Sequence, residues 1–288
     1  MSDEPLIAVF IDFENLAIGV RHMNNAGPFN ISLVLKRLLE KGRIVMKRAY
    51  CDWSNYRDAV REFHTHGIEL IDIPQSRMSG KNSADIRMVV DAMDLCYAKQ
   101  HIDIFALISG DSDFSPLVSK LKENNRRVLG VGVKSSTSDL LIANCDEFIY
   151  YDDLIRVAKK VPAKVAQVVV AKEGTSPASG SKGDKQVDKQ QEAIERVLEV
   201  LHSIEQDFDP LWGSTLKQAI RRVFPGFNEG YYGYNSFSEL LEMIDDKGLI
   251  ELEYDESKKN YKVWPAREEQ RRPPPRNSAN SSGNKPTR

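Results

Sequence analysis

The chain has 288 residues, of which 41% are hydrophobic and 28% are charged, and its formal net charge is −2. This composition is ordinary for a globular protein of up to two domains, and it excludes a generally basic protein that coats nucleic acid, although local basic patches remain open. Three widely spaced cysteines predict reduced thiols rather than a disulfide or zinc framework. Because no signal-like segment opens the chain and no apolar run approaches ~18 residues, we expect no membrane span and a cytoplasmic location.

The first half of the chain alternates strand-like and helix-like segments. Short apolar runs predict strands at 6–11, 43–50, 68–73, 105–108, 128–133 and 148–150. Helical patterns or turn signals lie between them at 16–22, 31–39, 54–66, 82–99, 117–123 and 138–143. This alternation predicts an α/β domain over residues 1–156, with a parallel sheet, right-handed crossovers and flanking helices.

Acidic residues follow two of these predicted strands. Asp12 comes directly after the first strand, and Asp111 and Asp113 follow 105–108 across the Ser109–Gly110 turn. Helix capping explains one acid after this turn well and two poorly. If the first strand lies beside the fourth, these strand ends meet at the topological switch point, where open α/β sheets bind ligands.

A further acid lies in the helix expected over 82–99. The apolar stripe of this helix is expected to comprise Ile86, Val89, Val90, Met93 and Cys96. Asp85 shares a face with Val89 and Ala92, so we expect it to point inward. Asp94 is expected in solvent, and the pattern leaves the side of Asp91 undecided.

The four acids Asp12, Asp85, Asp111 and Asp113 predict a metal centre. Clustered carboxylates repel one another unless a cation neutralises them, and hard divalent ions such as Mg²⁺ or Mn²⁺ prefer oxygen ligands. Asn15 is expected either to add an amide ligand or to orient a water. Ser109 is expected to hold either a metal-bound water or one of the acids.

The second half of the chain predicts a small separate module. A stretch rich in Gly, Ser, Lys and Gln near 172–191 indicates a flexible linker, which we assign to 157–189. Helical patterns at 194–204, 216–224 and 236–247, followed by a hairpin of 249–254 and 260–264, predict a winged-helix module at 190–265. The Pro/Arg/Ser/Asn-rich tail at 266–288 is expected to be disordered.

Each of the two predicted domains resembles a known domain family. Residues 5–155 resemble the NYN domain of the PIN-like nuclease superfamily through the motifs IDFEN and SGDSDF and the Asp85 helix. This resemblance implies a PIN/Rossmann-like sheet and a metal-dependent endoribonuclease. It places Asp12, Asn15, Asp85, Asp111 and Asp113 at the metal-binding positions. Residues 190–265 resemble the LOTUS, or OST-HTH, winged-helix domain, which implies RNA binding.

The resulting hypothesis is a ribonuclease that the winged-helix module targets to RNA. Arg77 and Lys81 are candidates for gripping the RNA backbone, and Ser109 is a further candidate for substrate contact. In the module, Arg221 and Arg222 are candidates for phosphate contact or for a solvated face. Tyr232 is a candidate for stacking on a base or for packing in the core.

Two other classes of function remain open from the sequence. One is a non-catalytic RNA-binding adaptor, in which the winged-helix module also offers a surface for a homo-oligomer or a protein partner. The other is an aspartyl phosphatase, although that chemistry favours D-x-D after the first strand and the chain has Asp12 followed by Phe13 and Glu14.

Overall fold

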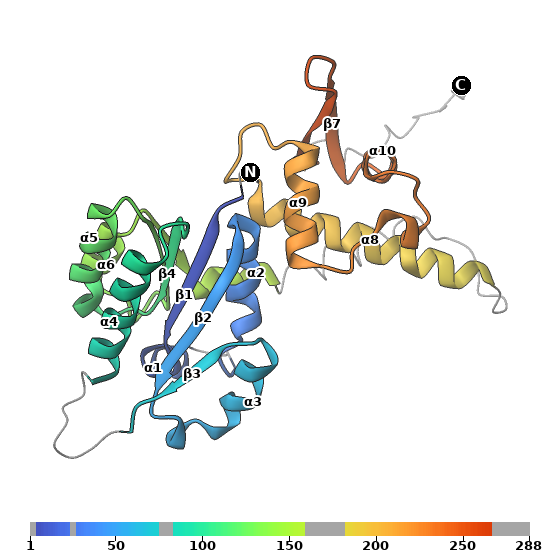
Figure 1. Cartoon of the computed structure of the whole chain (residues 1–288). Coiled ribbons are helices and arrows are strands. Elements are labelled where there is room, and N and C mark those ends of the chain that lie inside the picture. Colours follow the sequence, from blue (N-terminus) through green and yellow to red (C-terminus); the bar gives the residue numbers. More distant parts are fainter. Residues whose placement is uncertain (1–3, 24–26, 75–82, 159–181, 267–288) are drawn as a thin grey trace, which may run out of the picture.

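The computed structural model describes residues 4–23, 27–74, 83–158 and 182–266. In its N-terminal part, six parallel strands form one sheet in the order β3-β2-β1-β4-β5-β6 (Figure 1). The strands are β1 (Leu6–Asp12), β2 (Arg43–Cys51), β3 (Glu69–Asp72), β4 (Ile104–Ile108), β5 (Arg127–Gly132) and β6 (Glu147–Tyr150). The predicted parallel α/β sheet is therefore confirmed.

Helices cover both faces of this sheet. One face packs against α1 (Phe13–Arg21), α2 (Ile31–Lys41) and α3 (Arg57–Thr65), and the other against α4 (Ser83–Ala98), α5 (Ser115–Glu123) and α6 (Asp139–Asn144). The central strands β1 and β4 are apolar along their lengths because both of their faces are covered. Ile11 of β1 pairs with Ile108 of β4, so the carboxyl ends of these two strands lie side by side.

The buried side of α4 differs from the predicted stripe. Met88, Ala92 and Cys96 pack against the sheet, whereas Ile86 and Val90 are 64% and 48% exposed. The apolar residues of this helix spread over more of its circumference than a sheet can cover, so some of them remain at the surface.

Asp91 of α4, whose side the sequence pattern leaves undecided, is buried. Its carboxylate accepts a hydrogen bond from the Tyr50 hydroxyl at 2.9 Å and pairs with Arg87 at 2.9 Å. Asp91 is thus satisfied by structural contacts and is separate from the acids at the strand ends.

The C-terminal part has its own core of helices and a hairpin. Its elements are α8 (Lys182–Ile204), α9 (Gly213–Val223), the 3₁₀ helix η3 (Glu229–Tyr232), α10 (Phe237–Asp246), β7 (Ile250–Asp255) and β8 (Asn260–Pro265). Helix α8 begins at Lys182, inside the segment 157–189 that we expected as a linker. The loop 75–81, most of the expected linker and nearly all of the tail lie outside the described residues.

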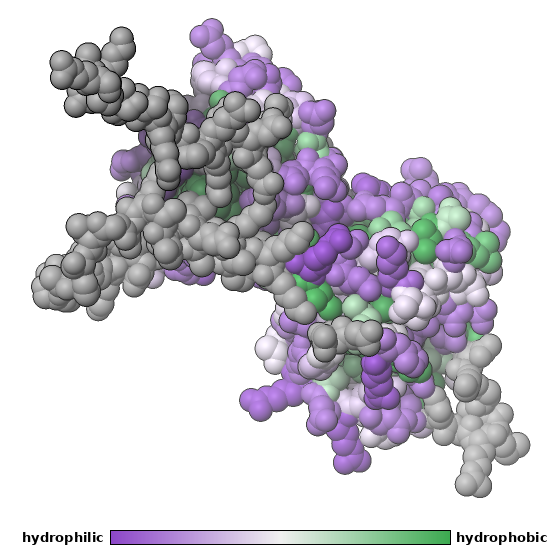
Figure 2. Space-filling view, turned by 180° about the vertical axis from the view of Figure 1, so that it is seen from behind, coloured by the Kyte–Doolittle hydropathy of each residue, from purple (hydrophilic) through white to green (hydrophobic). Residues whose placement is uncertain are grey.

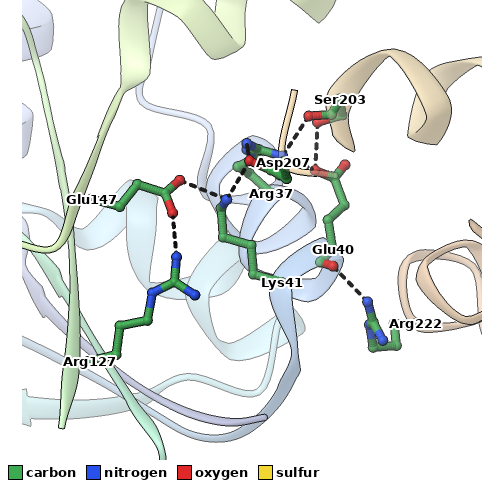
Figure 3. A network of polar contacts seen from close by, with 8 residues as sticks. All are labelled: Arg37, Glu40, Lys41, Arg127, Glu147, Ser203, Asp207 and Arg222. Carbon is green, nitrogen blue, oxygen red and sulfur yellow. Dashed lines mark hydrogen bonds and ion pairs between the residues drawn. The ribbon is translucent and has the colours of Figure 1, made fainter. Parts of the chain in front are cut away.

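The C-terminal part packs against α2, at the end of the sheet where the strands begin (Figures 1 and 3). The Arg222 guanidinium donates to the backbone oxygens of Leu39 and Glu40, both at 2.6 Å. These carbonyls belong to the last turn of α2 and lack partners within the helix, so Arg222 caps it. Arg37 of α2 also pairs with Asp207 at 2.9 Å. The two parts of the chain are therefore in direct contact through polar side chains.

Glu40 is a buried acid in this interface, which we call the α2 interface. Its side chain is 5% exposed, 3.0 Å from Arg37, and accepts a hydrogen bond from the Ser203 hydroxyl. Burial raises the pKa of Glu40 to about 7, an effect that the Ser203 and Arg37 contacts oppose and that nearby Asp207 increases. The folded protein therefore binds this proton more tightly than the unfolded chain, whose glutamate titrates near 4.5.

This shift predicts a pH-dependent stability. The stabilising contribution of protonated Glu40 is full below pH 4.5 and is lost as the pH rises to about 7. We expect the free energy of unfolding of wild type to fall by about 1–3 kcal/mol over this pH range because Glu40 ionises. Glu40→Gln keeps the shape of the side chain without ionising, so its free energy of unfolding should not show this fall. Urea unfolding across this pH range measures the difference between variant and wild type, with exposed Glu256→Gln as the matched control. Identical pH profiles for Glu40→Gln and wild type would contradict the assignment.

The composition also led to expectations about the cysteines and about membrane-spanning helices. All three cysteines lie in the described residues and are free thiols. Within the described ranges, none of the helices combines the length and apolar character that crossing a bilayer requires.

Candidate functional site

The candidate site begins at Asp12, the last residue of β1. Its side chain is 7% exposed, and one carboxylate oxygen caps α1 by accepting from the Asn15 N–H at 3.3 Å. The other oxygen accepts from the Ser109 hydroxyl at 2.8 Å. Ser109 is fully buried at the end of β4, so its expected substrate contact is wrong. The hydroxyl instead holds an acid in place, which is one of the two roles expected for it.

Asn15 and Gly110 join the two strand ends. The Gly110 N–H donates to the side-chain oxygen of Asn15 at 2.9 Å, which fixes the turn after β4 against α1. A Cβ at Gly110 would lie 2.7 Å from the backbone oxygen of Ser136, so only glycine fits this turn. The amide oxygen of Asn15 is thus engaged in positioning the turn, while its role as a metal ligand stays a prediction.

Asp111 and Asp113 follow this turn in the 3₁₀ helix η2 (Ser112–Phe114) and its cap. The Asp111 carboxylate accepts from the Asp113 N–H at 2.9 Å, and the Asp111 N–H donates to the Ser109 hydroxyl at 3.2 Å. Capping thus accounts for the position of Asp111 and leaves the exposed Asp113 unexplained.

The acids from β1, α4 and the turn after β4 share one electrostatic environment. Burial raises the pKa of Asp12 to about 7, and the charges of Asp85 and Asp111 add to the rise while the Ser109 hydroxyl opposes it. Burial also raises the pKa of Asp85 to about 6, with further contributions from Asp111, Asp113 and Glu14. The structure therefore brings together the four acids that the sequence pattern singled out.

Glu14 is an acid that the sequence reasoning missed. It lies in the first turn of α1, and its charge contributes to the raised pKa of Asp85. The sequence feature that could have identified Glu14 is its position in the IDFEN motif, two residues after Asp12. An acid in the first helical turn is explained by the helix dipole alone, which is why the pattern gave it no separate role.

The chemistry of these side chains fits a divalent cation. Among the described residues, no three His, Cys, Asp or Glu side chains converge closely enough to form a ready-made metal site. The described part of the chain, however, pairs none of Asp12, Asp85, Asp111 and Asp113 with a lysine or arginine. An oxygen-only set of mutually repelling carboxylates is the kind of ligand set that Mg²⁺ and Mn²⁺ prefer.

The other residues that were predicted to contact RNA are not part of the acid group. Arg222 is half-buried in the α2 interface, and its guanidinium bonds to Leu39, Glu40 and Glu4 there, so it is not available for the expected phosphate contact. Tyr232 is 2% exposed and packs 5.3 Å from Phe227, so it belongs to the core rather than to a base-stacking surface. The side chain of Arg221 is 55% exposed, and its phosphate contact stays a prediction. Arg77 and Lys81 lie outside the described residues.

Comparison with known proteins finds two domain families and several similar chains. A family model of the NYN domain matches residues 6–154, and a model of the OST-HTH/LOTUS domain matches residues 188–261. An uncharacterised protein of Methanocaldococcus jannaschii is 30% identical over 140 residues, which cover 48% of this chain and 52% of that protein. This chain thus spans about half the length of that relative.

Among solved structures, a protein of unknown function from Vibrio parahaemolyticus is similar to part of this chain. It shares 25% identity over 54% of this chain and 97% of its own, with a TM-score of 0.47.

Proposed function

The chain belongs to the NYN domain family, and from this premise we propose that it is a metal-dependent ribonuclease that hydrolyses RNA phosphodiesters. An NYN domain is followed by an OST-HTH/LOTUS domain, as the sequence motifs predicted. The NYN domain is a member of the PIN-like nuclease superfamily, and LOTUS domains bind RNA. This combination suggests an RNA nuclease.

The observation that supports the proposal most is the group of carboxylates at the adjoining ends of β1 and β4. Asp12, Asp85, Asp111 and Asp113 come from three separate elements, and burial together with the charges of neighbouring acids raises the pKa values of Asp12 and Asp85. A structural role does not require such a concentration of negative charge, which burial and repulsion make unfavourable. A catalytic cation site accounts for it.

In this proposal the four acids would hold one or two divalent cations. A bound cation supplies Lewis-acid activation of water and neutralises charge on the phosphate that is attacked. The chain's own contribution is orientation. The Ser109 hydroxyl and the Asn15 N–H fix the Asp12 carboxylate, and Asn15 fixes the turn that carries Asp111. Asp113 is exposed, so RNA can reach the acids from solvent, and we propose that it is cleaved internally.

The LOTUS module is proposed to recruit the RNA. It packs at the end of the sheet where the strands begin, whereas the acids lie at the opposite end, where β1 leads into α1 (Figure 1). RNA that is held by the module must therefore run along the NYN part to reach the acids. Recruitment of this kind raises the effective concentration of a long RNA at the site without contributing to the chemical step.

The test is cleavage of a short single-stranded RNA by the full chain with Mg²⁺ or Mn²⁺ present. Labelling one end and then the other distinguishes internal cleavage, which we expect, from trimming of an end. RNA binding without any cleavage would identify an adaptor instead. Phosphate covalently attached to Asp12 would identify the phosphatase chemistry.

A further inference from the structure

An open groove lies beside the acids, between α4, α5 and α6. It has a volume of about 680 Å³, within the range of small-molecule sites. We call it the α4–α6 groove. Its lining residues are Asp85, Ile86, Val89, Val90, Ser112, Asp113, Ser115, Pro116, Ser119, Leu140 and Asn144.

The walls of the α4–α6 groove are aliphatic and exposed. Ile86 and Val90 of α4 are 64% and 48% exposed, and Leu140 of α6 is 57% exposed. Figure 2 shows hydrophobic residues interrupting the largely hydrophilic surface at the end of the molecule where α5 and α6 lie. Single exposed aliphatic residues are common, but three of them lining one groove indicate a binding surface.

The groove lining also offers one polar acceptor. Ser115 belongs to the lining, but its Oγ is closed to solvent and does not reach a ligand in the groove. Asn144 lies in the same lining. Its Nδ2 donates to the Leu140 oxygen at 2.8 Å, and no described residue donates to its Oδ1.

The groove is continuous with the candidate catalytic site. Asp85 and Asp113 belong to the acid group and also line the groove. A ligand in the groove therefore extends to the acids. When the acids and their cation hold a phosphate, the part of the adjoining nucleotide that fits between the aliphatic walls is its base.

We propose that the α4–α6 groove binds one unpaired nucleobase of the RNA, next to the phosphate that is cleaved. The flat apolar faces of the base pack between the α4 side chains and Leu140. Its polar edge bonds with the Asn144 amide oxygen, as proteins commonly recognise single-stranded RNA. An apolar protein side chain would leave this oxygen unpaired. This inference rests on the proposed ribonuclease function and deepens it.

The experiment places one abasic nucleotide at successive positions of a single-stranded RNA and measures binding by fluorescence anisotropy and cleavage by gel. With the wild-type chain, one position near the cleaved bond should weaken binding about tenfold, the size of losing one packed base. Val90→Glu should weaken binding of the intact RNA to a similar degree and remove the sensitivity to that abasic position. Val45→Glu changes an aliphatic residue of similar exposure on β2 and is the matched control.

Ser115→Ala is a second control within the groove lining. Its Oγ makes no hydrogen bond within the described residues, so the midpoint of thermal unfolding should not fall. Binding of intact RNA should not change either, because this Oγ is closed off from the groove.

The outcomes distinguish the groove from the proposed activity. If RNA is cleaved, but no abasic position weakens binding and Val90→Glu binds RNA as wild type does, the groove proposal is overturned. The ribonuclease proposal is then retained, and a protein partner becomes the expected occupant of the groove. RNA binding without cleavage would overturn the proposed ribonuclease function. The abasic scan measured by anisotropy would still test whether the groove binds a base. A chain that neither binds nor cleaves RNA overturns both.

Discussion

Replacing Asp111 by asparagine is expected to slow RNA cleavage at least about a hundredfold, because several kcal/mol of cation-dependent stabilisation are lost with the carboxylate. The fold should remain intact, since the asparagine oxygen can still accept the Asp113 N–H that now bonds to Asp111 at 2.9 Å. Loss of one negative charge also relieves repulsion on Asp12 and Asp85, so stability without metal should be unchanged or slightly higher.

Asp94→Asn provides the matched control for this variant. Asp94 lies on an exposed part of α4, and its substitution makes the same change of charge away from the acid group. Single-turnover cleavage and thermal unfolding of both variants separate a catalytic loss from misfolding. If Asp111→Asn cleaves RNA as fast as wild type with Mg²⁺ or Mn²⁺ present, Asp111 is not a metal ligand and the assignment of cleavage to this acid group fails.

Removal of divalent cations is expected to abolish cleavage, and added Mg²⁺ or Mn²⁺ is expected to restore it. The acids form an oxygen-only set, and Asp12 and Asp85 have raised pKa values because burial and neighbouring acids disfavour their charged forms. A hard cation is the partner that compensates such charges. RNA cleavage should therefore follow the concentration of free cation, and Asp111→Asn should require more cation for half-maximal activity.

The control for chelation is EDTA that is saturated with Mg²⁺ beforehand, which shows whether EDTA itself inhibits. Far-ultraviolet circular dichroism before and after chelation tests whether the fold persists without metal. Cleavage that continues after exhaustive chelation would rule out the metal-dependent mechanism and favour acid–base catalysis by the carboxylates alone.

The sequence by itself determined the parallel sheet and the acids that follow its strands. Short apolar runs identify strands that are covered on both faces, and their alternation with helices leaves few possible topologies. Asp12 and Asp111 follow such runs, and the pairing of β1 with β4 places these strand ends side by side. The spacing of Ser236 and Glu239 likewise indicates a helix cap, and the Ser236 Oγ accepts the Glu239 N–H at 3.1 Å. The strands, the acids that follow them and the helix cap depend on residues close together in the sequence.

The roles of several polar residues were decided only by the tertiary structure. The basic and exposed pattern around Arg222 suggested a phosphate contact, but its guanidinium caps α2, whose sequence lies more than 180 residues away. Tyr232 is aromatic in a polar stretch, yet it packs into the core of the module. Ser109 orients Asp12 from a neighbouring strand.

The aliphatic residues of α4 also show the difference between what the sequence predicts and what the tertiary structure decides. Their helical spacing predicted the helix, but which of them are buried depends on how much of its circumference the sheet covers. Periodicity within a segment is a local property, and it determines which element forms. The partner of a side chain is determined by which distant segments the fold brings next to it. The sequence therefore predicted where the acids lie, and only the packed structure showed the groove beside them.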